Sequence, residues 1–397
     1  MNVLIVDEEV PFPLNTGKRI RTFNLVKRLA QGHTITYLCY QNASTMLPDL
    51  KNVTFEQLPS PILAQKGPLF YWSLLKNIFS PRPYSVDRHT SGMMKAKVSS
   101  LMHHQRYDLL HCEWTPYSEN IKDWISRIPS VLSAHNVEAQ IWYRLYRNER
   151  NIAKRCYTFL QWKKMERYER LVSRDYSEVM AVSEPDKDLF QSQYGCSHVS
   201  VIPNGIDETY FRPFPYPLKP NSMIFSGSMD WRPNQDGMRY FLNAIFPEIQ
   251  KRLPEATVTI AGRNPPPWLE DLAKTFRGVE ITGTVDDIRP FIAQGALYVV
   301  PLRIGGGSRL KILEALAMGK TVLSTSIGAE GLNLEDGTHL MLRDDPETFA
   351  QTAVDLLLHP EKYGHLGRQG RERVLAEYTW DSIVHLVDRI WQNAVKN

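Results

Sequence analysis

One short segment in the second half of the chain, Gly305–Glu314, combines glycines with two cations and a carboxylate that could bind an anionic ligand. The glycines Gly305–Gly307 let the backbone approach a ligand closely, and Ser308 can cap a helix whose free N–H groups favour an anion. Arg309 and Lys311 add positive charge there, and Glu314 lies on the same helix face as Lys311. Because a carboxylate among apolar neighbours needs a partner, the segment predicts one of two arrangements. Either it binds a nucleoside diphosphate with Glu314 on the ribose, or Lys311 and Glu314 form a buried pair that closes a glycine-rich turn.

A second candidate, His135, directly follows the strand-like run Ser130–Ala134 and begins the polar stretch His135–Glu138. Ligands of open α/β sheets bind at the carboxyl ends of the strands, so a histidine at this position can donate to a hydroxyl group or position one. The alternative is a structural histidine at the end of a strand. The sequence near it has no Ser or Cys nucleophile elbow, which argues against a nucleophilic triad.

Other cofactor and metal chemistry is not indicated. The first strand is not followed by a Gly-x-Gly-x-x-Gly fingerprint, and the chain has no Gly-x-x-x-x-Gly-Lys-Ser/Thr loop. The acidic pairs Asp286-Asp287 and Asp344-Asp345 are adjacent residues that do not converge as metal ligands, and we interpret them as caps or loop residues. The 4 cysteines are scattered without Cys-x-x-Cys spacing. We therefore expect no metal and no cofactor.

The hydrophobic pattern predicts an α/β fold in two domains, because 397 residues exceed one typical core. The first strand leads through the Pro13–Gly17 loop into a helical pattern from Ile20 to Leu29, and helical stretches separate most later strands. Four prolines between Phe211 and Pro220 break the pattern and place a linker there. Strands are predicted at Asn2–Val6, Thr34–Tyr40, Asp108–Cys112, Ser130–Ala134, Glu178–Val182, His198–Ile202, Met223–Ser226, Thr257–Ala261, Val279–Thr282, Leu297–Pro301 and Thr321–Thr325.

Charge is distributed unevenly along the chain. Residues 1–200 carry 26 Lys and Arg against 19 Asp and Glu, whereas residues 201–397 carry 21 against 24. The segment Arg144–Arg170 has nine basic and three acidic residues with aromatic residues between them. It predicts either a helix that lies on anionic lipid or a solvated helix with its aromatic side chains turned inward. No nucleic-acid-binding module is recognisable.

Taken together, the motifs resemble those of the retaining nucleotide-sugar glycosyltransferases of family 4 (group 1), which have the GT-B architecture. The resemblance covers nearly the whole chain. The motifs that carry it are the Pro13–Gly17 loop, His135–Glu138, Val182–Glu184, Ile202–Asp207, Phe225–Asn234, Gly283–Asp286 and Gly307–Gly319.

The resemblance implies a fold of two facing Rossmann-like domains with parallel sheets. Residues 1–205 would bind the acceptor, 206–222 would be the linker, 223–378 would bind the sugar nucleotide, and 379–397 would form a helix that crosses back to the first domain. The implied catalytic residues are His135, Arg309 and Lys311. The implied donor-binding residues are Gly17, Gly227, Gly283, Val285, Gly306, Gly307, Ser308 and Glu314.

One position departs from the family pattern. Glu314 matches the second glutamate of the Glu-x7-Glu motif, but the first would fall on Gly306, so the sequence leaves the donor sugar open. The implied reaction moves a hexose from a nucleotide sugar to a saccharide or lipid-linked acceptor in surface polysaccharide or exopolysaccharide synthesis, without a metal. The alternatives are a nucleotide-sugar epimerase on the same architecture and a non-catalytic nucleotide-sugar-binding subunit.

The start of the chain predicts a cytoplasmic location. Asn2–Val6 is followed at once by Asp7, Glu8 and Glu9, without the basic start and long apolar centre of a secretory signal. The basic first half makes peripheral contact with the anionic inner face of the membrane a further expectation, and no nucleic-acid partner is expected.

Overall fold

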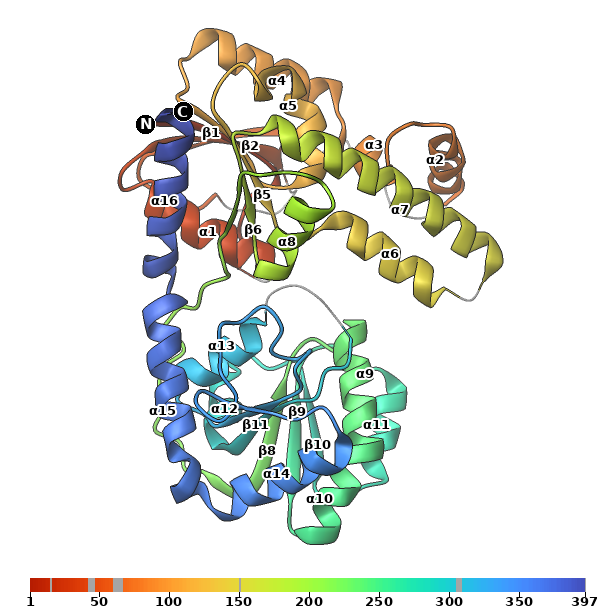
Figure 1. Cartoon of the computed structure of the whole chain (residues 1–397), viewed down its shortest axis with the longest axis vertical. Helices are drawn as coiled ribbons and strands as arrows, with labels where there is room; N and C mark the ends of the chain where they lie inside the picture. The colour runs from red at the N-terminus through yellow and green to blue at the C-terminus, as the bar shows by residue number, and fades with distance from the viewer. Residues whose placement is uncertain (15, 42–46, 60–66, 150, 305–308, 397) are drawn as a thin grey trace. The chain divides into compact units, whose positions relative to one another are not determined.

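The computed structural model describes residues 1–397 apart from residues 15, 42–46, 60–66, 150, 305–308 and 397 (Figure 1). The chain divides into two compact units. Unit 1 comprises Met1–Pro203 and Ile383–Asn397, and unit 2 comprises Asn204–Ser382. Each unit is built around its own parallel sheet, which confirms the predicted α/β class with two Rossmann-like sheets.

The sheet of unit 1 has the strand order β3-β2-β1-β4-β5-β6-β7, with every neighbouring pair parallel. Its interior strand β1 contains the run Val3–Val6, which is buried throughout, as is typical of a parallel strand covered on both faces. The elements of this unit are β1 (Asn2–Glu9), α1 (Gly17–Leu29), β2 (Thr34–Gln41), β3 (Val53–Pro59), α2 (Pro68–Ile78), α3 (Tyr84–His89), α4 (Gly92–His104), β4 (Leu109–Cys112), η1 (Thr115–Tyr117), α5 (Ser118–Ile125), β5 (Ser130–Ala134), α6 (Glu138–Asn148), α7 (Ile152–Val172), η2 (Ser173–Asp175), β6 (Glu178–Ala181), α8 (Glu184–Ser192), β7 (Val199–Val201) and the body of α16 (Trp380–Lys396).

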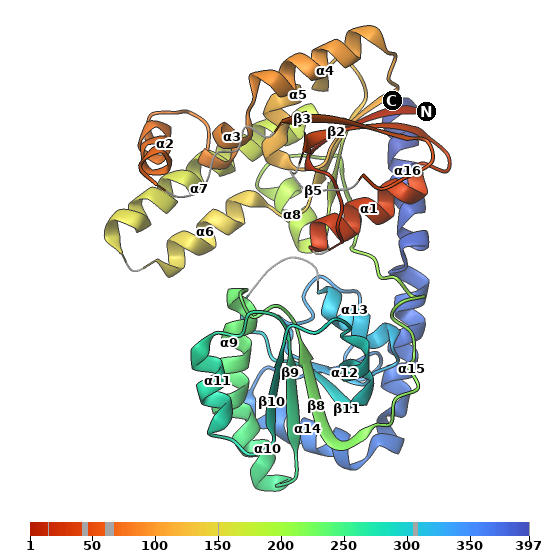
Figure 2. The ribbon, with the colours of Figure 1, turned by 180° about the vertical axis from the view of Figure 1, so that it is seen from behind.

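The sheet of unit 2 has the strand order β10-β9-β8-β11-β12-β13, also parallel, and Figure 2 shows β10, β9, β8 and β11 side by side. Buried side chains of its strands and helices form a continuous core. The elements are β8 (Lys219–Ser226), α9 (Arg232–Tyr240), the π-helical segment η3 (Phe241–Ile245), α10 (Phe246–Arg252), β9 (Thr257–Ala261), α11 (Pro267–Lys274), β10 (Val279–Gly283), α12 (Arg289–Gln294), β11 (Gly295–Val300), α13 (Leu310–Ala317), β12 (Val322–Ser324), β13 (Met341–Leu342), α14 (Pro346–Leu358) and α15 (Pro360–Glu377).

The predicted strands all occur, with shifts of a few residues at their ends, and the structure adds elements that the sequence pattern missed. β3, β13 and helix α2 were not predicted. β8 begins at Lys219, earlier than the predicted start at Met223, because Lys219 pairs with Gly295 of β11. Gly17, which we expected in a loop, is the first residue of α1, and Thr16 caps that helix by accepting a hydrogen bond from the amide of Arg19.

The cysteines of the described residues are free thiols. Cys39, Cys112 and Cys196 are buried free thiols, and Cys156 is exposed. Among the described residues, no helix combines the length and the apolar composition that crossing a membrane requires.

Candidate functional site

Helix α13 of unit 2 carries the predicted cation and carboxylate on one face. Lys311 and Glu314 lie one helical turn apart, and both are half-buried. The four residues before Arg309, which include Gly306, Gly307 and Ser308, lie outside the described residues. The predicted glycine loop and its serine cap therefore remain predictions.

Lys311 is held by elements that lie far from it in the sequence. Its Nζ donates a hydrogen bond of 2.7 Å to Oδ1 of Asn234 on α9, and it lies 4.1 Å from the centroid of the Phe225 ring in β8. Asn234 is fixed in turn, because its Nδ2 donates to the carbonyl of Ser228 at 2.7 Å. A Cβ at Gly227, whose φ is +152°, would lie 2.7 Å from the Lys311 Nζ, so glycine is needed there to seat the ammonium.

Burial dominates the electrostatics of this pair. Burial lowers the pKa of Lys311 to about 7, with the positive charge of Arg309 adding to the effect and Glu314 opposing it. Burial also raises the pKa of Glu314 to about 7, and the charge of Lys311 opposes that change. A cation and a carboxylate poised near neutrality beside the carboxyl end of β8 are suited to an anionic ligand that also has hydroxyl groups.

Arg309 directly precedes α13, and its guanidinium is turned into the unit. The residue is 2% exposed, and its Nη2 donates to the carbonyl of Ile327 at 2.8 Å and lies 3.5 Å from Oε2 of Glu330. Arg309 thus ties the start of α13 to the segment that follows β12. Its predicted contact with a diphosphate stays a prediction.

The other predicted donor residues of unit 2 follow the neighbouring strands. Gly227 follows β8, whereas Gly283 ends β10 with φ of +68° and Val285 lies half-buried in the loop after it. Gly262, which follows β9, contacts Gly227 so closely that a Cβ there would lie 1.9 Å from the Gly227 carbonyl oxygen. Glycines therefore allow the loops after β8 and β9 to meet.

The candidate histidine of unit 1 lies beside a buried carboxylate that the sequence reasoning missed. Nε2 of His135 is 3.3 Å from Oε1 of Glu113, which directly follows β4. The same Oε1 accepts a hydrogen bond of 2.6 Å from Thr22, and Oε2 lies 2.7 Å from Nε2 of His111. Burial raises the pKa of Glu113, but the neighbouring His111 and His135 lower it well below its usual value, so Glu113 is ionised.

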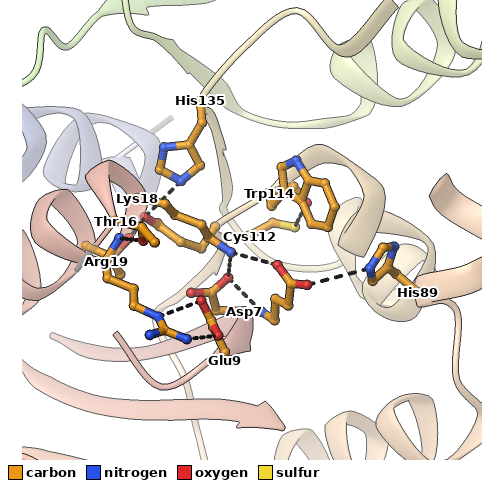
Figure 3. A network of polar contacts seen from close by, with 12 residues as sticks. Asp7, Glu9, Thr16, Lys18, Arg19, His89, Cys112, Trp114 and His135 are labelled. Atoms are coloured by element: carbon orange, nitrogen blue, oxygen red, sulfur yellow. Dashed lines mark hydrogen bonds and ion pairs between the residues drawn. The ribbon is translucent and has the colours of Figure 1, made fainter. Parts of the chain in front are cut away.

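Ion pairs connect the carboxyl end of β1 with the first turn of α1 and with His89 (Figure 3). Lys18, in the first turn of α1, pairs with Asp7 at 2.6 Å and with Glu8 at 3.5 Å, and Glu8 lies 3.6 Å from His89. Burial raises the pKa of Glu8, but His89 and Lys18 lower it to about 2. These acids end β1, so they gather at the sheet edge where His135 follows β5.

The structure brings together some of the predicted residues and separates others by unit. Gly227, Lys311 and Glu314 gather in unit 2, whereas Gly17 and His135 belong to unit 1. Glu113 and Lys18 were missed. Glu113 directly follows the predicted strand Asp108–Cys112, a position that could have identified it, whereas Lys18 lies within α1 and adjoins no predicted strand. Within the described part of the chain, no group of three or more His, Cys, Asp or Glu side chains could hold a metal ion.

Two family models match the chain. A model described as Glycosyltransferase Family 4 matches residues 17–210, and one described as Glycosyl transferases group 1 matches residues 220–359. The two parallel sheets and the likeness to solved structures show the GT-B fold. The chain belongs to the group 1 glycosyltransferases of family 4.

The chain is similar to individual proteins over half of its length or more. An uncharacterized 44.6 kDa protein in the cps region of Klebsiella pneumoniae is 24% identical over 378 residues, which are 89% of this chain and 90% of that protein. A GDP-mannose-dependent alpha-(1-6)-phosphatidylinositol monomannoside mannosyltransferase of Mycobacterium tuberculosis is 26% identical over 52% of this chain and 59% of its own length. The structure of Anabaena HepE, in complex with UDP and glucose, superposes with a TM-score of 0.66 over 99% of this chain and 100% of HepE, at 13% identity.

Proposed function

We propose that the chain is a retaining glycosyltransferase that moves a hexose from a nucleotide sugar to a saccharide or lipid-linked acceptor in surface polysaccharide or exopolysaccharide synthesis. The observation that carries the proposal is the placement of Lys311 beside Asn234 and Gly227, with Glu314 one turn further along α13. Two relatives support a saccharide or lipid-linked acceptor. One is encoded in a cps region, and the other is named as a mannosyltransferase of phosphatidylinositol monomannoside.

The chemistry follows from charge. When the glycosidic bond breaks, the departing nucleoside diphosphate develops negative charge, and Lys311, Arg309 and the amides at the start of α13 stabilise it. Glu314 accepts hydrogen bonds from the ribose hydroxyls, and His135 contacts the transferred sugar. Gly17 at the start of α1, Gly283 at the end of β10 and Val285 after it contact the donor, as do Gly227, Gly306, Gly307 and Ser308. Departure and attack on one face of the sugar retain the anomeric configuration.

The donor can be identified by thermal unfolding of the full chain with UDP, GDP and ADP, because a ligand that binds the folded state raises the midpoint. The matching nucleotide sugars, each labelled in the sugar, are then incubated with the protein and with polyprenyl-diphosphate saccharide acceptors. Transfer with retained configuration is expected. Epimer formation, binding without turnover, or inverted configuration would each contradict the proposal.

Peripheral contact with an anionic membrane is part of the proposal, and the exposed side of α2 supports it. Five large apolar side chains at and after this helix are exposed, and Phe79 is 90% exposed: Tyr71, Trp72, Leu75, Ile78 and Phe79. Their spacing places them along one side of the helix. Lys164 of α7 fixes α2 by donating to the carbonyls of Asn77 and Ile78 at 2.6 and 3.1 Å.

Helices α6 and α7, which lie beside α2, carry exposed positive charge that would attract anionic lipid. In both views α2, α6 and α7 lie on the same side of unit 1 (Figures 1 and 2). The exposed basic residues of α6 and α7 are Arg144, Arg147, Lys154, Arg155, Lys163, Arg167 and Arg170. By contrast, Glu149 and Glu166 are half-buried and Glu169 is buried. An apolar helix face beside solvent-facing cations is suited to a bilayer of anionic lipid.

Vesicle flotation tests this surface. The double variant Trp72→Ser/Phe79→Ser is expected to lose at least about 10-fold in binding to vesicles with anionic lipid, because each side chain contributes about 1.5–3 kcal/mol when buried. Leu218→Ser, which removes a 60% exposed leucine of unit 2, is the matched control and should bind like the unaltered protein. Equal binding of the double variant, or equal binding to neutral vesicles, would contradict membrane docking through α2.

A further inference from the structure

Two hydrogen bonds and one ion-pair contact lead from the C-terminal helix to the candidate histidine within unit 1. Trp391 of α16 is fully buried, and its indole Nε1 donates a hydrogen bond of 3.1 Å to Nδ1 of His111 on β4. Nε2 of His111 lies 2.7 Å from Glu113, and Glu113 lies 3.3 Å from Nε2 of His135. These residues come from three segments that lie far apart in the sequence.

The chemistry of the groups fixes the direction of each bond. An indole N–H only donates, so Nδ1 of His111 must accept, and a neutral His111 then carries its proton on Nε2. That Nε2–H donates to the ionised Glu113, which can only accept. Thr22 supplies a second donor to the carboxylate at 2.6 Å. The carboxylate therefore also favours a proton on Nε2 of His135, which leaves Nδ1 of that ring as the acceptor.

Charged groups from other elements surround Glu113 as well. Asp7 on β1 and Lys18 and Arg21 on α1 all interact with it electrostatically. The cations of α1 favour the ionised carboxylate, whereas Asp7 disfavours it. Arg21 is itself fixed, because its guanidinium donates to the carbonyls of Ile202 and Pro203 at 2.9 and 2.7 Å.

We propose that Glu113, His111 and Trp391 are positioning residues for glycosyl transfer, which hold His135 as the Nε2–H tautomer so that its Nδ1 accepts a hydroxyl of the sugar. The inference rests on the proposed role of His135 in transfer. It assigns to the C-terminal helix a part in the reaction: the indole N–H of Trp391 sets the tautomer of His111, and His111 in turn orients the carboxylate.

The replacement Glu113→Gln tests the logic because its outcome is directional. His111 still presents an N–H, so the amide oxygen of Gln must turn toward it. The amide NH2 group then faces His135, whose Nε2 must lose its proton and whose Nδ1 must gain one. The variant therefore inverts the tautomer of His135 while preserving the size of the side chain.

Nitrogen-15 NMR of protein labelled in histidine reads this out without any activity. Signals are assigned with His135→Gln and His111→Asn variants, and far-UV circular dichroism verifies that each variant is folded. We expect Nε2–H for His135 and His111 in the unaltered protein, and Nδ1–H for His135 in Glu113→Gln. A proton on Nδ1 of His135 in the unaltered protein, or an unchanged tautomer in Glu113→Gln, would overturn the proposal.

Kinetics provide the second readout. Glu113→Gln is expected to lower kcat on the order of 10²-fold with the donor KM within about 3-fold, since an amide that selects the wrong tautomer impairs the reaction step rather than binding. Trp391→Phe removes one neutral hydrogen bond and should lower kcat about 3- to 10-fold.

Trp380 on the same helix offers a matched control for Trp391. It is also buried, but its Nε1 has no hydrogen-bond partner in the described part of the chain. Trp380→Phe should therefore leave kcat unchanged, and equal losses in the two tryptophan variants would refute the role of the Trp391 N–H. An unaltered protein that shows the expected tautomers but transfers no sugar would instead refute the proposed function.

Discussion

Replacing Lys311 with Met should make the ligand-free protein more stable while it removes donor binding. Burial lowers the pKa of this lysine from 10.5 to about 7. At about 1.4 kcal/mol per pH unit, the fold holds the ammonium about 5 kcal/mol less favourably than the unfolded chain does. The attraction between Lys311 and Glu314 is already part of this pKa. The variant also loses the hydrogen bond from the ammonium to Asn234, which offsets up to about 3 kcal/mol. A net gain of about 2 kcal/mol remains.

The gain in the free energy of unfolding of Lys311→Met should decrease as the pH rises. The folded protein releases the Lys311 proton near pH 7 and the unfolded chain near pH 10.5, so the unfolded chain binds more protons between these values. The free-energy cost of keeping the charged Lys311 ammonium in the folded protein is therefore complete below about pH 7. This cost disappears as the pH approaches 10.5. The stability difference between Lys311→Met and the unaltered protein should shrink from pH 6.5 to pH 9.5.

Calorimetric unfolding at both pH values and titration with UDP and GDP measure the two effects. The expected gain corresponds to a midpoint about 4–8 °C higher for a unit of this size, together with at least about 10-fold weaker nucleotide binding. Lys274→Met is the matched control, since Lys274 is 74% exposed and pairs only with exposed Asp271 among the described contacts. A destabilised Lys311→Met variant, or one that binds the nucleotide with unchanged affinity, would refute the reasoning.

The remaining predictions concern the same unit. Gly262→Ala should destabilise it by about 2–4 kcal/mol in urea unfolding, because its Cβ would lie 1.9 Å from a carbonyl oxygen, whereas Gly283→Ala, with no atom within 4 Å of its Cβ, should cost only about 1 kcal/mol for its φ of +68°. Equal costs would contradict the close approach of the two loops. The affinity for a nucleotide sugar should fall about 10-fold per pH unit above pH 7 as Lys311 loses its proton, and calorimetry in buffers of different ionisation enthalpy should detect proton uptake on binding. A flat profile would exclude Lys311 from the diphosphate contact. Treatment with EDTA followed by desalting should leave the transfer rate within about 2-fold, because fixed cations stabilise the leaving group, and recovery only on adding a divalent metal would contradict this.

Local sequence patterns were enough to predict most of the strands and the position of the cationic helix. Runs such as Val3–Val6 are apolar on both faces, and only a strand covered by helices on both sides buries them completely. The spacing of Lys311 and Glu314 placed them on one helical face, since that property depends on the local period of the helix alone. The unpredicted strand β3 has an intermediate burial pattern, without a clear apolar run to identify it.

The partners of these residues, by contrast, follow from how the whole chain packs. Asn234 meets Lys311 across 77 residues of sequence, and Trp391 meets His111 across 280. No local pattern encodes such pairs, because they arise when parallel crossovers bring successive strand ends to one edge and the last helix packs on the first unit. The same packing removed Lys311 and Glu113 from solvent in part or in full. Burial lowers the pKa of Lys311 and the neighbouring histidines lower that of Glu113, shifts that the residue types alone do not specify.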